Sequence, residues 1–156
     1  MGERGELNVG QLARQRYGSD CYIIGFTTYE GDVRAANDWD QPGQRKLVRP
    51  ALAGSYEALF HASGMGDFLL HLRPDESARR ALMGPMLERA IGVVYHPHTE
   101  RVSHYFHTRL PEQFDTILHI DRTRALEPLD DPAPALPEQA PARAQNEPPE
   151  TFPFGV

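Results

Sequence analysis

Four of the seven histidines lie close together in the second half of the chain, which makes this segment the first place to look for chemistry. His96 and His98 are two residues apart, a spacing that places both rings on one side of a strand, but Pro97 between them favours a turn. His104 and His107 are three residues apart, so on a strand they would face opposite sides. Zinc sites usually add carboxylate or thiolate ligands to their histidines. Together with the spacing of the two histidine pairs, this favours surface or packing histidines over a metal site.

A polar stretch directly follows the first apolar segment of the chain. Its members are Thr27, Thr28, Tyr29, Glu30 and Gly31. In an α/β sheet, ligands bind beyond the carboxyl ends of the strands, so these residues would border a cleft if the preceding strand is parallel. The glycine would allow a close backbone approach or a positive φ. A structural turn explains the same residues equally well.

Nucleophilic catalysis has weak support in the sequence. Cys21, the one cysteine, lies in an apolar segment where a thiol is usually an inert core residue. Ser103 precedes His104, and adjacent residues on a strand face opposite sides, while Ser55 suits a helix cap. No glycine-rich nucleotide loop and no G-x-S-x-G motif is present.

Paired carboxylates could perform acid–base chemistry, but no spacing singles out one pair. The two candidate pairs are Glu57 with Asp67 and Glu100 with Glu112. Composition and spacing alone therefore yield no mechanism, and we assign no catalytic residue, no cofactor and no metal ligand from them.

The elements that would position these residues predict an α/β or α+β fold. Asn8 followed by Gln11 resembles a capping box at the start of a first helix, which Gly18 would end. Short apolar runs between turn residues predict strands. The further helices expected are 56–63 and 77–82, and the strands expected are 21–26, 45–48, 67–72, 90–95, 102–106 and 115–120, with 27–43 polar and rich in turns.

The composition of the chain limits its domain organisation and the classes of protein to which it can belong. The chain has 156 residues and a net charge of −6, and half of its 14 prolines lie in residues 130–156. We expect a body, residues 1–129, and a disordered, acidic, proline-rich tail, residues 130–156. The absence of a basic cluster argues against nucleic-acid binding, and the absence of a long apolar run or a leader predicts a cytoplasmic protein with no membrane span.

Four separated blocks carry a family resemblance. They read ELNVGQLAR at 6–14, IGFTTYEG at 24–31, GSYEALF at 54–60, and RAIGVVY, SHYF and LPEQFD between 89 and 115. Together they resemble the C-terminal third of the erythromycin esterase family, which includes succinoglycan-biosynthesis-type homologues, over about residues 3–129. The resemblance implies an α/β fold that forms only part of a larger domain, with a partial sheet and flanking helices.

The same resemblance implies a bacterial, antibiotic-resistance-related esterase that hydrolyses a macrolide ester by histidine-activated water. The family's catalytic His and Glu lie in its N-terminal half, outside these blocks, so no catalytic residue is carried over. The stretch of Thr27, Thr28, Tyr29, Glu30 and Gly31 is the part expected to border the family's cleft, and His104 and Tyr105 are further cleft-lining candidates.

Three hypotheses follow. The first is a C-terminal portion of such a hydrolase, inactive alone, whose partner is the missing N-terminal half or a second copy and whose substrate is a small ester. The second is a non-catalytic binding module with the tail as an interaction segment. The third is a small enzyme that uses the histidines between His96 and His107, with or without a metal.

Overall fold

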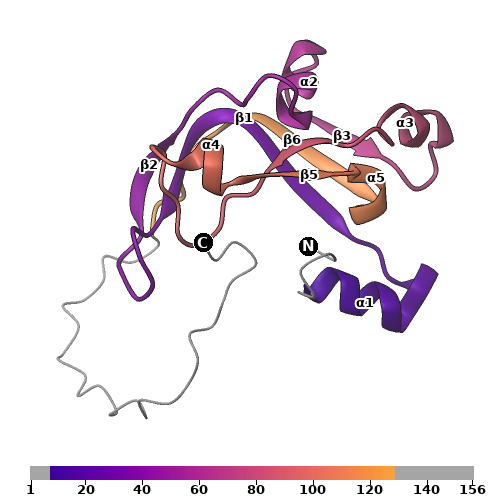
Figure 1. Ribbon diagram of the computed structural model, residues 1–156, viewed down its shortest axis with the longest axis horizontal. Coiled ribbons are helices and arrows are strands. Elements are labelled where there is room, and N and C mark those ends of the chain that lie inside the picture. Colours follow the sequence, from indigo (N-terminus) through magenta and orange to yellow (C-terminus); the bar gives the residue numbers. More distant parts are fainter. Residues whose placement is uncertain (1–7, 129–156) are drawn as a thin grey trace.

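The computed structural model describes residues 8–128, and the tail expected for residues 130–156 lies outside them (Figure 1). The helices are α1 (Val9–Tyr17), a 3₁₀ turn η2 (Gly18–Asp20), α2 (Tyr56–Ala62), α3 (Glu76–Ala81), α4 (Glu100–Ser103) and α5 (Leu110–Gln113). The strands are β1 (Ile24–Ala35), β2 (Gln44–Val48), β3 (Phe68–His71), β4 (Met86–Arg89), β5 (Tyr105–Thr108) and β6 (Thr116–Thr123). This is the expected α/β fold, a partial sheet with flanking helices.

Four strands form one sheet in the order β2-β1-β6-β3, and β4 pairs with β5 in a separate antiparallel ribbon. The long strand β1 runs parallel to β6 up to Gly31 and then antiparallel to β2. Gly31 has φ +128°, and a Cβ at this position would lie 2.2 Å from the carbonyl oxygen of Thr123. Only glycine therefore allows β1 to change partners at this point.

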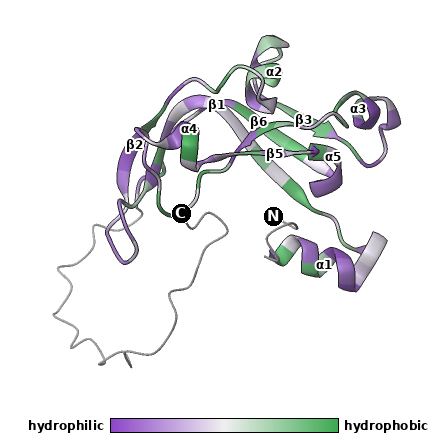
Figure 2. Ribbon diagram, in the orientation of Figure 1, coloured by the Kyte–Doolittle hydropathy of each residue, from purple (hydrophilic) through white to green (hydrophobic). Residues whose placement is uncertain are grey.

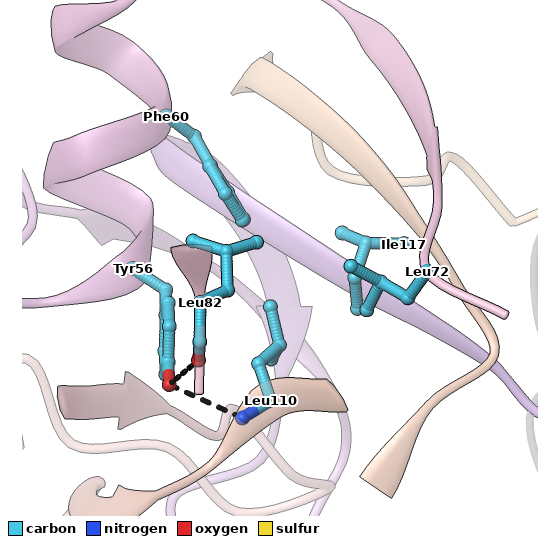
Figure 3. Close-up of a cluster of buried hydrophobic side chains, with 6 residues drawn as sticks. All are labelled: Tyr56, Phe60, Leu72, Leu82, Leu110 and Ile117. Carbon is cyan, nitrogen blue, oxygen red and sulfur yellow. Dashed lines mark hydrogen bonds between the residues drawn. The ribbon is translucent and has the colours of Figure 1, made fainter. Parts of the chain in front are cut away.

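The main core lies between α2 and one face of this sheet (Figure 3). Ser55 caps α2 by accepting a hydrogen bond from the Ala58 amide, which sets the direction of the helix. The buried cluster consists of Tyr56, Phe60, Leu72, Leu82, Leu110 and Ile117. The hydroxyl of Tyr56 accepts from the Leu110 amide at 3.2 Å and lies 3.1 Å from the Leu82 carbonyl, so α2 is tied to two other segments.

The opposite face of the sheet is only partly covered by the described residues. Phe26, Leu118 and Leu69 pair side by side across β1, β6 and β3, so their side chains share this face. Phe26 is 69% exposed and Leu69 is 51% exposed. Figure 2 shows hydrophobic colouring along β6, β3 and the first part of β1. We call Phe26, Leu69 and Leu118 the open face.

Helix α1 also presents apolar side chains to solvent. Asn8 accepts from the Gln11 amide and Gly18 ends the helix, as the capping pattern predicts. No residue of α1 is buried, and Val9 and Leu12 are largely exposed. Figure 1 shows α1 set apart from the sheet, beyond the start of β1. The helix is held by Arg14, which donates to the Cys21 carbonyl and to Asp115.

Three expectations about the elements were wrong. The first strand begins at Ile24 and not at residue 21, leaves Cys21 outside it, and continues to Ala35 through the stretch predicted as a loop. Its polar residues are accommodated because Glu30 and Asp32 face arginines on neighbouring strands. Residues 90–95 form no strand but an irregular segment with a single bridge, and the strand expected at 102–106 is replaced by α4 followed by β5.

Candidate functional site

A pocket of about 390 Å³ lies against β1 and β6 on the same side of the sheet as the open face. Its floor includes Phe26, Thr28 and Ile120, and its walls come from Ile91 and Gly92 and from residues 123–126. The irregular 90–95 segment is held close by backbone bonds from Ala36, whose amide donates to the Val93 carbonyl. One wall of the pocket is therefore formed by residues 90–95, the segment that the sequence predicted to be a strand.

The pocket lining includes a buried arginine, Arg89, at the end of β4. Its side chain is 1% exposed and forms an ion pair with Glu100 of α4 at 2.8 Å. Its guanidinium also donates to the backbone carbonyls of Thr28 and Tyr29 at 2.5 and 2.7 Å, and to that of Arg49 at 2.8 Å. One side chain thus ties β1, β4, α4 and the segment after β2 together.

Two carboxyl groups, those of Glu57 and Glu88, lie near the backbone of Arg89. Glu57 of α2 is fully buried and accepts a hydrogen bond from the Arg89 amide at 2.9 Å. Burial raises the pKa of Glu57. Burial, followed by the nearby charge of Glu57, raises the pKa of Glu88 to about 8. Glu88 is therefore a neutral acid at pH 7, although it does not line the pocket.

The structure brings some of the predicted cleft residues together around Arg89. The Thr28 and Tyr29 carbonyls bind its guanidinium, and Tyr105 lies with its ring 5.8 Å from it. Tyr105 accepts a hydrogen bond from the Leu52 amide. Glu30 lies 3.9 Å from Arg122 at the surface. Of the predicted set, Thr27 and Thr28 line the pocket.

The hydroxyl of Thr27 and the ring of His104 make their hydrogen bonds away from the pocket. Thr27 is buried and hydrogen-bonds through its hydroxyl to Nδ1 of His119, on the core side of the sheet. His104 is buried beside Tyr95, and its Nδ1 lies 3.1 Å from the Ala90 carbonyl. Burial lowers the pKa of His104, so its ring is neutral at pH 7. His104 therefore supports the 90–95 segment rather than facing the pocket.

The remaining chemistry-bearing residues are dispersed. Ser103 donates to the Thr99 carbonyl and does not contact His104 through its side chain. Within residues 8–128, no group of three or more His, Cys, Asp or Glu side chains is arranged to hold a metal ion. No helix of the described part is long and apolar enough to cross a membrane.

Sequence reasoning missed Arg89 and Glu88 and paired the other carboxylates differently. Glu57 faces Glu88 rather than Asp67, and Glu100 pairs with Arg89 rather than with Glu112. The two members of each pair lie on separate helices or strands, so no local spacing in the sequence predicts the pairs. The one available signal was the isolated charge between apolar runs at residues 88–89, which is unusual for a strand facing a core.

Comparison with known proteins identifies the family of this chain. The model of the erythromycin esterase family matches residues 1–123. The chain belongs to the erythromycin esterase family. Two solved structures share its fold with a TM-score of 0.60 each: a Bacillus cereus protein that is 20% identical over 74% of this chain, and a succinoglycan biosynthesis protein that is 25% identical over 76% of it.

The length of the match bears on what the chain can do. It covers 28% of each of these two solved proteins, so it spans little more than a quarter of their length. The expected position as part of a larger erythromycin-esterase-like domain fits this coverage. The open face and the exposed apolar side of α1 are what a separated portion of such a domain would present.

Proposed function

We propose that this chain serves as the C-terminal portion of an erythromycin-esterase-like hydrolase and has no esterase activity alone. The catalytic histidine and glutamate that activate water in the family would come from a segment other than residues 8–128. The pocket between β1 and the 90–95 segment would border the substrate cleft, and the substrate would be an ester, including macrolide esters.

The observation that supports this most strongly is the open face. Across β1, β6 and β3 in the described residues, Phe26 and Leu69 are exposed on either side of the half-buried Leu118, and the apolar side of α1 adds to them. Exposed apolar patches of this kind mark surfaces that are covered in the functional assembly. Arg89 and its partners stabilise the wall of the cleft next to that surface.

The test has two arms. The purified 156-residue chain is assayed with p-nitrophenyl esters and with macrolides, and we expect no hydrolysis above background. It is then co-expressed with the polypeptide encoded directly upstream of it, and we expect the two to co-purify and to hydrolyse an ester. Hydrolysis by the chain alone, abolished by changing one of its own residues, would refute the proposal, and so would failure of the pair to co-purify.

A matched pair of variants locates the contact surface. Phe26→Asp places a charge on the open face and should abolish co-purification. Leu47→Asp introduces the same charge at another exposed apolar residue of the sheet, which is 66% exposed, and should leave co-purification intact. Equal loss in both variants would show that the open face has no special role.

A further inference from the structure

The pocket has a lining that suits a particular class of ligand, whether or not hydrolysis occurs there. Its volume of about 390 Å³ falls in the range of pockets that hold small organic molecules. The surfaces that would meet the body of such a ligand are apolar. They are supplied by Phe26, Val33, Ile91, Ile120 and Leu126.

The charged groups of the lining are all of one sign. Arg34, Arg89 and Arg124 line the pocket, and no Asp or Glu does so among the described residues. Arg89 is neutralised by Glu100, from which it is separated by 2.8 Å. Arg34 and Arg124 are exposed, and neither forms an ion pair within the described part of the chain. The positive charge of the pocket therefore comes from these two residues.

A nearby acidic group, Asp32, does not cancel that charge. Asp32 lies close enough to Arg124 for the arginine to lower its pKa, but the larger causes of that lowering are the hydrogen bonds from Arg45 and from the Ala125 amide. Arg45 holds both carboxylate oxygens of Asp32, at 2.8 and 2.9 Å. A bidentate pair of this kind leaves Asp32 engaged, so Arg124 remains available to a ligand.

From this arrangement we propose that the pocket binds a small organic carboxylate with an apolar body. Guanidinium groups match the two oxygens of a carboxylate, and Arg34 and Arg124 would hold that group while the body lies on Phe26 and Ile120. A phosphate is less suited, because no helix begins among the described lining residues to offer the backbone N–H groups that phosphate sites use.

The experiment titrates the 156-residue chain with octanoate, octan-1-ol and octyl phosphate by isothermal titration calorimetry. We expect octanoate to bind with saturation at one site and octan-1-ol to bind at least about tenfold more weakly, since it keeps the apolar body and lacks the charge. Octyl phosphate should bind no more tightly than octanoate. Absence of octanoate binding up to about 10 mM, equal binding of the alcohol, or tighter binding of the phosphate would each overturn the proposal.

Two variants locate the site. The double substitution Arg34→Gln with Arg124→Gln removes both available guanidiniums at exposed positions, and should weaken octanoate binding about tenfold or more. Arg122→Gln removes a neighbouring surface arginine of β6 that does not line the pocket, and should change binding less than about twofold. An equal effect of the two would assign the binding to general surface charge and refute the site. Circular dichroism of both variants checks whether each remains folded.

Discussion

Replacement of Arg89 by methionine should destabilise the chain severely, because Arg89 connects four segments from a fully buried position. The substitution leaves Glu100, which is 2% exposed, without its partner at 2.8 Å. It also leaves the carbonyls of Thr28 and Tyr29 without their shared donor. Breaking a buried ion pair from one side costs about 3–5 kcal/mol.

The expected magnitude lies at the lower end of this range. Arg49 remains 3.6 Å from the other carboxylate oxygen of Glu100 and offsets part of the loss of charge. We therefore expect Arg89→Met to lower the free energy of unfolding by about 3 kcal/mol. The measurement is urea denaturation at pH 7, followed by far-ultraviolet circular dichroism.

The control is a second arginine whose carboxylate partner is at the surface. Arg80 lies 3.7 Å from Glu76 on α3, and both side chains are mostly exposed. Arg80→Met should therefore cost less than about 1 kcal/mol. The double variant Arg89→Met with Glu100→Met should recover part of the loss, because it removes the uncompensated charge. A loss below about 1 kcal/mol for Arg89→Met, or no recovery in the double variant, would refute the reasoning.

Three further substitutions test other parts of the structure. Glu88→Gln should stabilise the chain by about 2–3 kcal/mol at pH 8.5 and have little effect at pH 4.5, because the raised pKa of Glu88, about 8, makes the wild type lose stability as the pH rises towards that value. Gly31→Ala should cost at least about 3 kcal/mol or prevent folding, since the new Cβ meets the Thr123 carbonyl. Asp115→Asn should cost about 2 kcal/mol at pH 7, because Asp115 accepts from Arg14 at 2.6 Å and is paired in the folded state.

Each of these is measured as a difference in unfolding free energy from wild type. Burial alone would raise the pKa of Asp115, but its hydrogen bonds and neighbouring arginines outweigh burial, so the pKa lies below its ordinary value. The stability that Asp115 contributes is therefore present at neutral pH and is lost as the pH falls through this lowered pKa. A pH-independent effect of Glu88→Gln, a stable Gly31→Ala variant, or a neutral Asp115→Asn change would contradict the respective assignment.

The sequence predicted well what depends on near neighbours along the chain. The caps Asn8 and Ser55 act through hydrogen bonds to residues three positions later, so both helix starts are where the pattern places them. The prediction of a strand at residues 90–95 was wrong, because an apolar run is compatible both with a strand and with a buried irregular segment. Here the backbone hydrogen bonds of this segment go to Ala36 and His104 at single points, and no ladder forms.

The candidate site was harder to predict, because it depends on contacts between residues that are far apart in the sequence. Thr28 and Tyr29 were selected as cleft residues, and the structure places their carbonyls on Arg89, which the sequence analysis did not select. The contact joins residues about sixty positions apart. Such a pairing depends on the β1–β6 register and on the position of β4, so it becomes visible only once the sheet is built.

We propose that this chain is one portion of a hydrolase and depends on another portion for activity. The most direct measurement is the rate of ester hydrolysis by a fixed amount of the 156-residue chain, titrated with the separately purified upstream polypeptide. We predict no rate without that polypeptide and a rise that saturates at equal amounts of the two, lost with Phe26→Asp and kept with Leu47→Asp. A rate that is present in the chain alone, or that grows with the added polypeptide without saturating, would contradict the account.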